Sequence, residues 1–456
     1  MRSLLLSRAS RAAPRALPAA RSLSASTGPT SPFLSPLFGL SESAAAVFSA
    51  AEAFAAAEIA PHAARWDAES HFPEEALRRA AAAGFATMWV SPDFGGGGMS
   101  RADSLPALEA LAAACPSTAA FLSIHGMVAA MIDGAGSAEQ KARYLPRLAS
   151  MDLIASYCLT EPGAGSDAAA LTTRAVLEPH GSAAGGPCYT LTGQKAFISG
   201  AGASGLYVVM ARTGGAGPGG VSAFLVDKDA PGLSFGANEA KMGWKCQPTR
   251  QVFFDGVRLP PSALLGREGQ GFKMAMNALD GGRLSIGACS LGGADACLAR
   301  ALAHAATRSQ FGRPLADNQA LAFALADSGM ALFTARLALR AAAGAYDAGH
   351  PDARALCALA KAQATEKSLA VIDQALQLHG GYGYLGSTGV EKYLRDCRVS
   401  AGGTSSALPA LARAHTLTCP LLPHTPAARA RTQVHTILEG TSQIMRVLVA
   451  RAMLHP

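Results

Sequence analysis

Residues 434–446 place one carboxylate among apolar residues at a point where a helix is predicted to begin. Glu439 follows Ile437 and Leu438 and precedes Gly440, which allows a tight backbone turn. A carboxylate in apolar surroundings loses hydration, so its pKa rises toward the range that suits a general base. The alternative is a glutamate placed at a helix start because the helix dipole stabilises it there. This stretch alone leaves both interpretations open.

The residues after Glu439 predict the helix that would hold it. Thr441 or Ser442 can cap the helix, and apolar residues then recur at helical spacing. These apolar residues are Ile444, Met445, Leu448 and Val449.

Four further segments carry polar groups that could hold a ligand. Residues 157–167 read as a strand that runs into a glycine loop with hydroxyl groups, and residues 195–200 pair Phe197 with the hydroxyl of a serine. Residues 308–313 carry two arginines suited to phosphates, and residues 377–381 bring glycines to a helix end. Each segment alone is better explained as an ordinary turn, core aromatic or helix end. Only their order along the chain, taken together, favours a shared ligand site over these separate explanations.

The predicted secondary structure that must position these segments changes along the chain. Helical patterns occupy about residues 43–151, apolar β-rich runs punctuated by Gly, Pro and Asp occupy about 153–265, and helical patterns return from 271. Predicted strands include 189–192, 206–210, 221–226 and 251–254; predicted long helices are 271–308, 315–348 and 352–379. The sequence therefore predicts an α+β protein with helical, β and helical regions in that order.

The charge of the chain is concentrated in its first residues. The full sequence has 39 Lys and Arg against 32 Asp and Glu, a formal charge of +7. Residues 1–41 are rich in Ser and Ala and carry no acid, which is typical of an organelle transit peptide. They contain Arg2, Arg8, Arg11, Arg15 and Arg21. Without these five arginines, 34 basic residues face 32 acidic ones, which argues against a nucleic-acid partner.

Cysteine and histidine spacing excludes several other classes. The nine cysteines form no C-x-x-C pair, so we expect buried free thiols, and the eleven histidines form no metal-binding motif. We expect no metal site. No run of eighteen apolar residues occurs, so we expect no membrane-spanning segment.

In this order and spacing, the segments resemble the acyl-CoA dehydrogenase family. The similarity runs from about residue 43 to 456 and is carried by residues 157–167, 310–315 and 438–446. It implies an N-terminal helical domain at 42–152, a middle β-barrel-like domain at 153–265 and a C-terminal four-helix bundle at 266–456. FAD is the implied cofactor.

The resemblance also assigns residues to the cofactor and the substrate. The isoalloxazine ring of FAD would be lined by Tyr157, Leu159, Thr160, Phe197 and Ser199. Its pyrophosphate and adenosine would be held by Arg308, Gln310, Phe311, Leu315 and Asn318. The FAD of a neighbouring subunit would be reached by Gln377, Gly380 and Gly381. Further FAD contacts would come from Thr441 and Gln443, and the acyl-CoA would be contacted by Ser166, Asp280, Arg283 and Gly440.

By the same resemblance, Glu439 is the base that removes the α-proton of an acyl-CoA thioester, and the β-hydride passes to FAD. Electrons would then pass to electron-transfer flavoprotein, from a homotetramer in the mitochondrial matrix. Residues 195–202, residues 243–250 and Leu438 are most similar to members that convert isobutyryl-CoA to methacrylyl-CoA in valine breakdown. The alternatives are a short-chain or 2-methylbutyryl-CoA dehydrogenase, an acyl-CoA oxidase, and an inactive or nucleic-acid-binding flavoprotein relative.

One segment departs from the family pattern. In family members a sequence like residues 393–399 runs directly into one like 435–439, whereas here about 35 residues intervene. Residues 400–433 are rich in Pro, Ala, Thr and Arg without a clear period. Removing codons 399–433 joins Arg398 to Val434 in frame, and the flanking residues can be encoded with splice-site dinucleotides. We interpret the segment as a retained intron or, alternatively, as a true surface loop, which loop-closure entropy tolerates.

Overall fold

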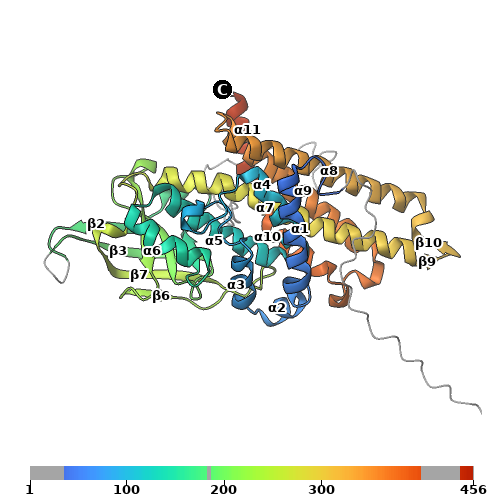
Figure 1. Cartoon of the computed structure of the whole chain (residues 1–456), viewed down its shortest axis with the longest axis horizontal. Coiled ribbons are helices and arrows are strands. Elements are labelled where there is room, and N and C mark those ends of the chain that lie inside the picture. The colour runs from blue at the N-terminus through green and yellow to red at the C-terminus, as the bar shows by residue number, and fades with distance from the viewer. Residues whose placement is uncertain (1–34, 182–185, 402–441, 455–456) are drawn as a thin grey trace, which may run out of the picture.

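The computed structural model describes residues 35–181, 186–401 and 442–454. Glu439, Gly440, Thr441, most of the predicted transit peptide and nearly all of residues 400–433 lie outside this part, as does the side chain of Gln443. The predicted order of helical, β and helical regions is confirmed. Figure 1 shows the sheet at one end of an elongated molecule and the long C-terminal helices extending to the other end.

The N-terminal region is built of helices, and three of its α-helices begin at a serine whose side chain caps them. They are α1 (Glu42–Phe54), a π-helical turn (Ala55–Ile59), α2 (Ala63–Glu69), α3 (Glu74–Ala82), α4 (Arg101–Ala114), α5 (Pro116–Ala135) and α6 (Ala138–Ala149). Ser41 caps α1, and Ser137 with Gln140 forms a reciprocal capping box at the start of α6. Such caps satisfy backbone N–H groups that a helix start leaves without partners.

The residues before α1 lie against a helix of the C-terminal region. Arg340 donates hydrogen bonds to the carbonyl oxygens of Pro36 and Phe38. The ring of Phe38 lies 5.6 Å from the ring of Phe333, centroid to centroid. Residues 35–41, which the sequence assigns to the transit peptide, are therefore packed on the folded body.

The middle region forms one eight-stranded sheet. Its strands are β1 (Ala155–Cys158), β2 (Arg174–Glu178), β3 (Cys188–Ser199), β4 (Leu206–Arg212), β5 (Val221–Asp227), β6 (Leu233–Phe235), β7 (Thr249–Leu259) and β8 (Leu264–Leu265). The strand order is β6-β7-β3-β2-β4-β5-β8, with β1 parallel to β4. The centres of β4 and β5 are buried on both faces, which explains their continuous apolar runs.

The described part of the C-terminal region contains three long helices and two shorter ones. These are α7 (Gly271–Thr307), α8 (Gln319–Asp347), α9 (Ala353–Leu378), α10 (Val390–Ala401) and α11 (Ser442–Leu454). A short hairpin of β9 (Ser309–Gln310) and β10 (Arg313–Pro314) joins α7 to α8. Both α10 and α11 pack against α9.

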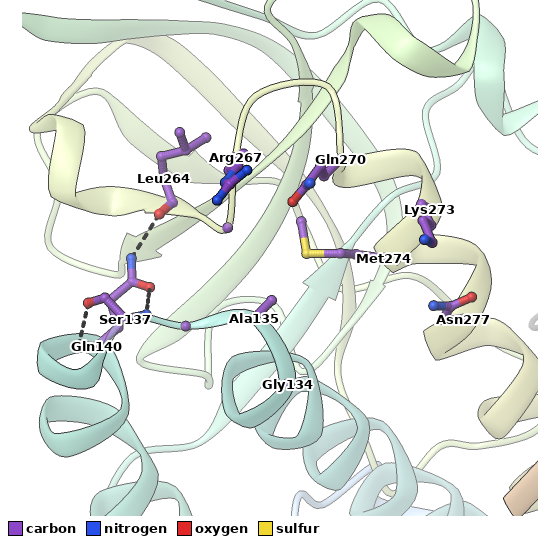
Figure 2. Close-up of a pocket in the computed structure, with 12 residues that line it drawn as sticks. Gly134, Ala135, Ser137, Gln140, Leu264, Arg267, Gln270, Lys273, Met274 and Asn277 are labelled. Atoms are coloured by element: carbon purple, nitrogen blue, oxygen red, sulfur yellow. Dashed lines mark hydrogen bonds between the residues drawn. The ribbon is translucent and has the colours of Figure 1, made fainter. Parts of the chain in front are cut away.

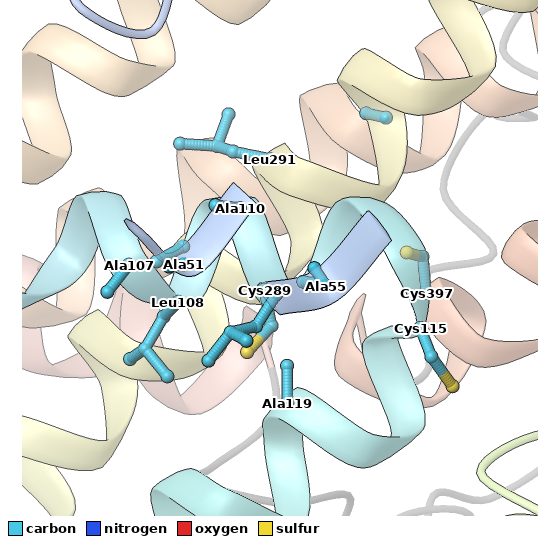
Figure 3. Close-up of a cluster of buried hydrophobic side chains, with 14 of the residues drawn as sticks. Ala51, Ala55, Ala107, Leu108, Ala110, Cys115, Ala119, Cys289, Leu291 and Cys397 are labelled. Atoms are coloured by element: carbon cyan, nitrogen blue, oxygen red, sulfur yellow. The ribbon is translucent and has the colours of Figure 1, made fainter. Parts of the chain in front are cut away.

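One large core joins the two helical regions. It includes α1 through Ala51, α4 through Leu108, α5 through Ala119 and α7 through Cys289 and Leu291, as Figure 3 shows. Small residues allow close approach: a Cβ at Gly292 would lie 2.0 Å from the carbonyl oxygen of Glu109. Helix α7 therefore connects the sheet to the helical regions: it contacts the sheet near its start and packs against α9 along its length.

Three described helices, α5, α7 and α8, are long and apolar enough to cross a membrane by length and composition alone. The apolar windows of α5 and α7 are 78% and 67% buried inside the protein, so their hydropathy belongs to the core. The window of α8 is only 28% buried, which leaves one apolar face of α8 uncovered in the single chain.

Candidate functional site

Two strand ends meet to form the first part of the site. The N–H of Ala196 donates to the carbonyl of Thr160 at 2.9 Å, and the Ser156 hydroxyl donates to the carbonyl of Ser199 at 2.6 Å. These bonds join the end of β1 to the end of β3. They bring together all five residues predicted to line a flavin ring: Tyr157, Leu159, Thr160, Phe197 and Ser199.

A buried ion pair fixes this junction from behind. The Lys195 ammonium lies 2.8 Å from Oε1 of Glu161 and donates to the carbonyl of Leu159 at 3.0 Å. The Glu161 carboxylate also accepts hydrogen bonds from the backbone N–H groups of Thr172 and Thr173, at 2.7 and 2.9 Å. Burial would raise the pKa of Glu161, but the Lys195 charge and these hydrogen bonds outweigh it and lower the pKa to about 2.

Phe197 presents its ring outward at the end of β3. The pairing of β3 with β7 shifts register between Lys195 and Ile198, so the strand bulges there. Phe197 adopts a left-handed φ of 58°, and the residue is 53% exposed. A large apolar ring held outward on an unfavourable backbone is typical of a ligand site. The hydroxyl-bearing Ser199, which is buried, lies two residues away.

Gly200 is required where β3 turns away from the site. Its φ is +81°, and a Cβ there would lie 2.6 Å from Oγ of Ser156 and 2.8 Å from Phe121. The N–H of Gly200 donates to the carbonyl of Pro248 at 2.8 Å. Only glycine fits both the conformation and the space.

An apolar wall extends from this junction into the helices. Trp244, Ala120, Ile124 and Ile286 form a buried cluster, and Tyr157 packs against it. The wall therefore combines α5, α7 and the loop before β7 beside the predicted ring site. Trp244 was not among the predicted site residues, because a lone tryptophan in a loop gives no indication of what it packs on.

A second group of predicted residues gathers around the C-terminal end of α7. Arg308 ends α7, and its guanidinium lies 5.9 Å from the ring of Tyr382. The rings of His304 and His379 stack with centroids 4.6 Å apart. These contacts bring the start of the hairpin to the end of α9. This group contains Arg308, Gln310, Phe311, Leu315, Asn318, Gln377, Gly380 and Gly381.

Most residues of this second group are exposed. Phe311 is fully exposed at the hairpin tip with a left-handed φ of 55°. Gln377, Gly380 and Gly381 are exposed as well. Asn318 has a structural role, because its side chain caps α8 by accepting from Ala320 N–H at 3.0 Å.

The two groups do not form one site within a single chain. Tyr157 packs near Ile286, and 22 residues separate Ile286 from Arg308 along α7. At about 1.5 Å per helical residue this is about 33 Å. Figure 1 shows the hairpin of β9 and β10 at the end of the molecule farthest from the sheet. The expectation that Arg308 and its neighbours hold the same FAD as Tyr157 therefore cannot be met by one chain alone.

The predicted substrate contacts that the structure describes lie on the loop after β1 and in the first half of α7. Ser166 is exposed on the loop after β1, and Ala164 and Ala168 of that loop share a core with Ala275 and Ala278 of α7. Asp280 and Arg283 are buried one turn further on and form an ion pair. Arg354 from α9 also contacts Asp280, with Nε 3.1 Å from Oδ2.

Two surface cavities flank this region. One, of about 520 Å³, lies between the end of α5, the start of α6 and the start of α7, and contains Arg267 and Lys273 (Figure 2). None of the predicted site residues lines it. The other, of about 700 Å³, begins at Asp167, directly after Ser166, and contains Arg174 and Arg212.

The described residues contain no group of three or more His, Cys, Asp or Glu side chains that could hold a metal ion. All eight cysteines in this part of the chain are buried and free, as the sequence predicts.

Comparisons with known proteins identify the family and the fold. The sequence profiles described as acyl-CoA dehydrogenase N-terminal, middle and C-terminal domains match residues 41–152, 156–257 and 269–408. The chain belongs to the acyl-CoA dehydrogenase family. It is 46% identical to the mitochondrial isobutyryl-CoA dehydrogenase of Dictyostelium discoideum over 417 residues, covering 91% of this chain and 90% of that protein. The Bos taurus enzyme of the same name is 44% identical over 421 residues, covering 92% and 91%.

Solved structures of acyl-CoA dehydrogenases share the fold. Butyryl-CoA dehydrogenase from Megasphaera elsdenii matches with a TM-score of 0.80 and 30% identity, covering 92% of this chain and all of that one. A chain solved in work on the electron transferring flavoprotein of Acidaminococcus fermentans matches with a TM-score of 0.80 and 32% identity, covering the same shares of the two chains.

As an acyl-CoA dehydrogenase, the protein is an FAD-dependent oxidoreductase. The residues at the β1 and β3 ends fit a flat polar heterocycle, because an outward aromatic ring lies beside hydroxyl groups and backbone amides. Sequence reasoning included Glu161 and Lys195 in its segments but missed their role. The sequence signal for this pair was a lysine at an otherwise apolar strand end together with a glutamate in the glycine loop, which are residue types that can pair when buried.

Proposed function

We propose that this protein oxidises isobutyryl-CoA to methacrylyl-CoA, as in valine catabolism. The observation that carries this proposal is the similarity, over about nine tenths of both chains, to two proteins named isobutyryl-CoA dehydrogenase. The conversion removes one hydrogen from the α-carbon and one from the β-carbon. The chain must therefore supply a base, a polarised thioester and a positioned hydride acceptor.

Glu439 is the proposed base. Its position after two apolar residues suits removal of the weakly acidic α-proton, because a poorly hydrated carboxylate is a stronger base. Thr441, Gln443 and Gly440 follow it and would contact the cofactor and the thioester. When bound, FAD accepts the hydride that leaves the β-carbon.

The described residues would orient the ligands. Phe197 and Tyr157 would flank the flavin ring, while Ser199 and Thr160 offer hydroxyl groups to its edge. The acyl-CoA would pass Ser166 on the exposed loop, and the cavity that begins at Asp167 offers the Arg174 side chain to its phosphates.

The site is completed by a second copy in this proposal, and we propose a homotetramer. In a single chain the residues around Arg308 lie far from those around Tyr157, so a neighbouring chain must bring them to one cofactor. Helix α8 offers a surface for such contacts: Phe323, Met330 and Leu337 recur every seven residues and are 60%, 57% and 43% exposed.

Electron-transfer flavoprotein is the proposed electron acceptor, and the mitochondrial matrix the proposed compartment. The arginine-rich leader and the mitochondrial names of the two relatives support the compartment. The family membership supports the acceptor. Oxygen consumption without added acceptor would instead indicate an acyl-CoA oxidase.

Anaerobic titration tests the function directly. Purified protein mixed with isobutyryl-CoA should lose its yellow flavin absorbance, and butyryl-CoA and 2-methylbutyryl-CoA should act more weakly. Glu439→Gln should keep FAD but react about 10²–10⁴ times more slowly, whereas Glu75→Gln, at a side chain 89% exposed, should match the wild type. Unbleached flavin with every acyl-CoA would show an inactive relative, and faster bleaching by a straight-chain substrate would replace the isobutyryl assignment.

We further propose that residues 400–433 arise from a retained intron. Helix α10 ends at Ala401 and α11 begins at Ser442, so the segment falls between two helices that both pack on α9. Transcript sequencing decides the matter: most reads should join the codons of Arg398 and Val434. Reads that mostly contain the intervening codons would establish a genuine loop.

A further inference from the structure

Two cysteines from distant parts of the chain meet in the core behind the predicted flavin site. The sulfur atoms of Cys115 and Cys246 lie 3.9 Å apart, although 131 residues separate them. Cys115 is the single residue between α4 and α5, and Cys246 lies in the loop that precedes β7. Both side chains are buried, with relative exposures of 0% and 1%. Figure 3 labels Cys115 among the buried residues of the main helical core.

The surroundings of Cys115 favour its thiolate. The Lys392 ammonium lies 3.3 Å from the Cys115 sulfur, and Cys115 occupies the N-cap position of α5, where the helix dipole favours negative charge. The hydrogen bond with Cys246 and the charge of Lys392 lower the pKa of Cys115 in spite of its burial. The same hydrogen bond raises the pKa of Cys246, as does its burial.

Other buried cysteines have the opposite character. Burial raises the pKa of Cys158, Cys297 and Cys357 to about 12 in each case. Their thiols are therefore poor nucleophiles. The contact between Cys115, Cys246 and Lys392 is thus a distinct chemical environment within this core.

We propose that Cys115 and Cys246 form an oxidant-responsive thiol pair that closes into a disulfide when the protein meets hydrogen peroxide. The pairing needs little movement. A disulfide has an S–S distance of about 2.0 Å, so the two sulfurs must approach by roughly 1.9 Å.

The reaction balances with one peroxide molecule. The Cys115 thiolate attacks a peroxide oxygen; an S–O bond forms, the O–O bond breaks, and the departing hydroxide takes up the proton that Cys115 had released. Cys246 then attacks the Cys115 sulfenic acid; an S–S bond forms, the S–O bond breaks, and the second hydroxide leaves as water with the Cys246 proton. Two thiols are oxidised, and one hydrogen peroxide is reduced to two waters.

Closure of this pair would act on the wall of the proposed flavin site. Cys246 lies two residues after Trp244, whose backbone N–H donates to Oδ1 of Asp396 at 2.7 Å. Asp396 in turn holds Lys392, with 2.6 Å between Oδ2 and Nζ. Trp244 packs in the cluster that contacts Tyr157. A shift of this loop would therefore change the packing around Tyr157, beside the proposed position of the flavin ring.

The test is a linkage map of the full-length protein before and after peroxide. Treated wild-type protein should lose two free thiols and yield a Cys115–Cys246 peptide under non-reducing conditions, and dithiothreitol should reverse both changes. Cys246→Ser should give no linked peptide and should accumulate a Cys115 sulfenic acid that dimedone traps. Cys297→Ser, which removes a buried thiol outside the pair, should form the link as the wild type does.

The absence of the linked peptide from treated wild-type protein would overturn the proposal, as would equal oxidation of Cys297 and Cys115. Lys392→Met provides a second criterion, since loss of the cation should slow linkage at least several-fold; unchanged linkage in this variant would remove the thiolate argument. These readouts need no turnover, so failure of the proposed isobutyryl-CoA activity would leave them interpretable.

Discussion

Lys195 and Glu161 form an ion pair, 2.8 Å long, in which both side chains are at most 4% exposed although 34 residues separate them. The pair joins the loop after β1 to β3, and the residues predicted to line the flavin ring lie in β1, in this loop and at the end of β3. In our proposal neither Lys195 nor Glu161 contacts a ligand, yet their ion pair holds together the two segments that would bind the flavin.

Breaking this pair should destabilise the protein and weaken flavin retention. Lys195→Met leaves a buried carboxylate without its cation, which costs about 3–5 kcal/mol. Urea unfolding and the ratio of flavin to protein absorbance measure the two effects. As a control, Arg143→Ala removes the cation of the exposed pair with Asp227 and should cost no more than about 1 kcal/mol. Equal effects of the two substitutions would contradict the structural role of Lys195.

The same pair predicts a pH dependence of stability. The pKa of Glu161 is lowered from an ordinary 4.5 to about 2 in the folded protein. A lowered pKa means that the contribution is complete above pH 4.5 and declines as the pH falls toward 2. The difference in melting temperature between wild type and Glu161→Gln should therefore be constant from pH 7 to 5 and shrink below pH 4.5. A melting-temperature difference that grows as the pH falls would show that the pKa of Glu161 is raised, not lowered, in the folded protein.

Gly200→Ala should disturb the end of β3. The left-handed backbone costs alanine about 1–2 kcal/mol, and contact with Ser156 and Phe121 adds about 1–3 kcal/mol of overpacking. Chemical denaturation measures the loss, and weaker flavin binding should accompany it. Gly219→Ala is the matched control, because nothing lies within 4 Å of a Cβ there. Wild-type stability of Gly200→Ala would refute the close contact.

Met330→Glu should dissociate the proposed tetramer. It places a charge in the middle of the exposed stripe that contains Phe323 and Leu337, and a buried unpaired charge is expensive. Sedimentation should show smaller species, and FAD should be lost because the residues around Arg308 no longer reach a neighbouring site. Val176→Glu, at an exposed residue of β2, should leave both unchanged. An intact tetramer in Met330→Glu would exclude α8 from the interface.

The helices were predictable because their composition is uniform over long stretches. The predicted range 271–308 agrees with α7 at Gly271–Thr307, and 352–379 agrees with α9 at Ala353–Leu378. The predicted strand 189–192 covers only the first part of β3, since Gly193, Gln194 and Lys195 interrupt the apolar pattern and the strand continues through a bulge. Tertiary pairing with β7 maintains the strand where local propensity does not.

That the predicted ring-lining residues lie together was predictable, but the distance between the two groups of site residues was not. The motifs placed Tyr157, Thr160, Phe197 and Ser199 at two strand ends, and the structure brings these strand ends together. Sequence spacing contains no information on which end of a 37-residue helix faces which partner, so Arg308 was assigned to the same cofactor as Tyr157. The Glu161–Lys195 pair shows the same limit, since contacts across 34 residues depend on the fold.

The seven residues before α1 bear on where the proposed transit peptide would be cut. Pro36 and Phe38 supply the carbonyl oxygens to which the Arg340 guanidinium donates, and the Phe38 ring covers Phe333. A cut at residue 41 would remove both carbonyl oxygens that accept from the half-buried Arg340 guanidinium. It would also expose Phe333 of α8. A cut upstream of Ser35 would keep these contacts, so in our proposal the discarded leader ends before Ser35 and the contacts with Arg340 and Phe333 stay with the folded enzyme.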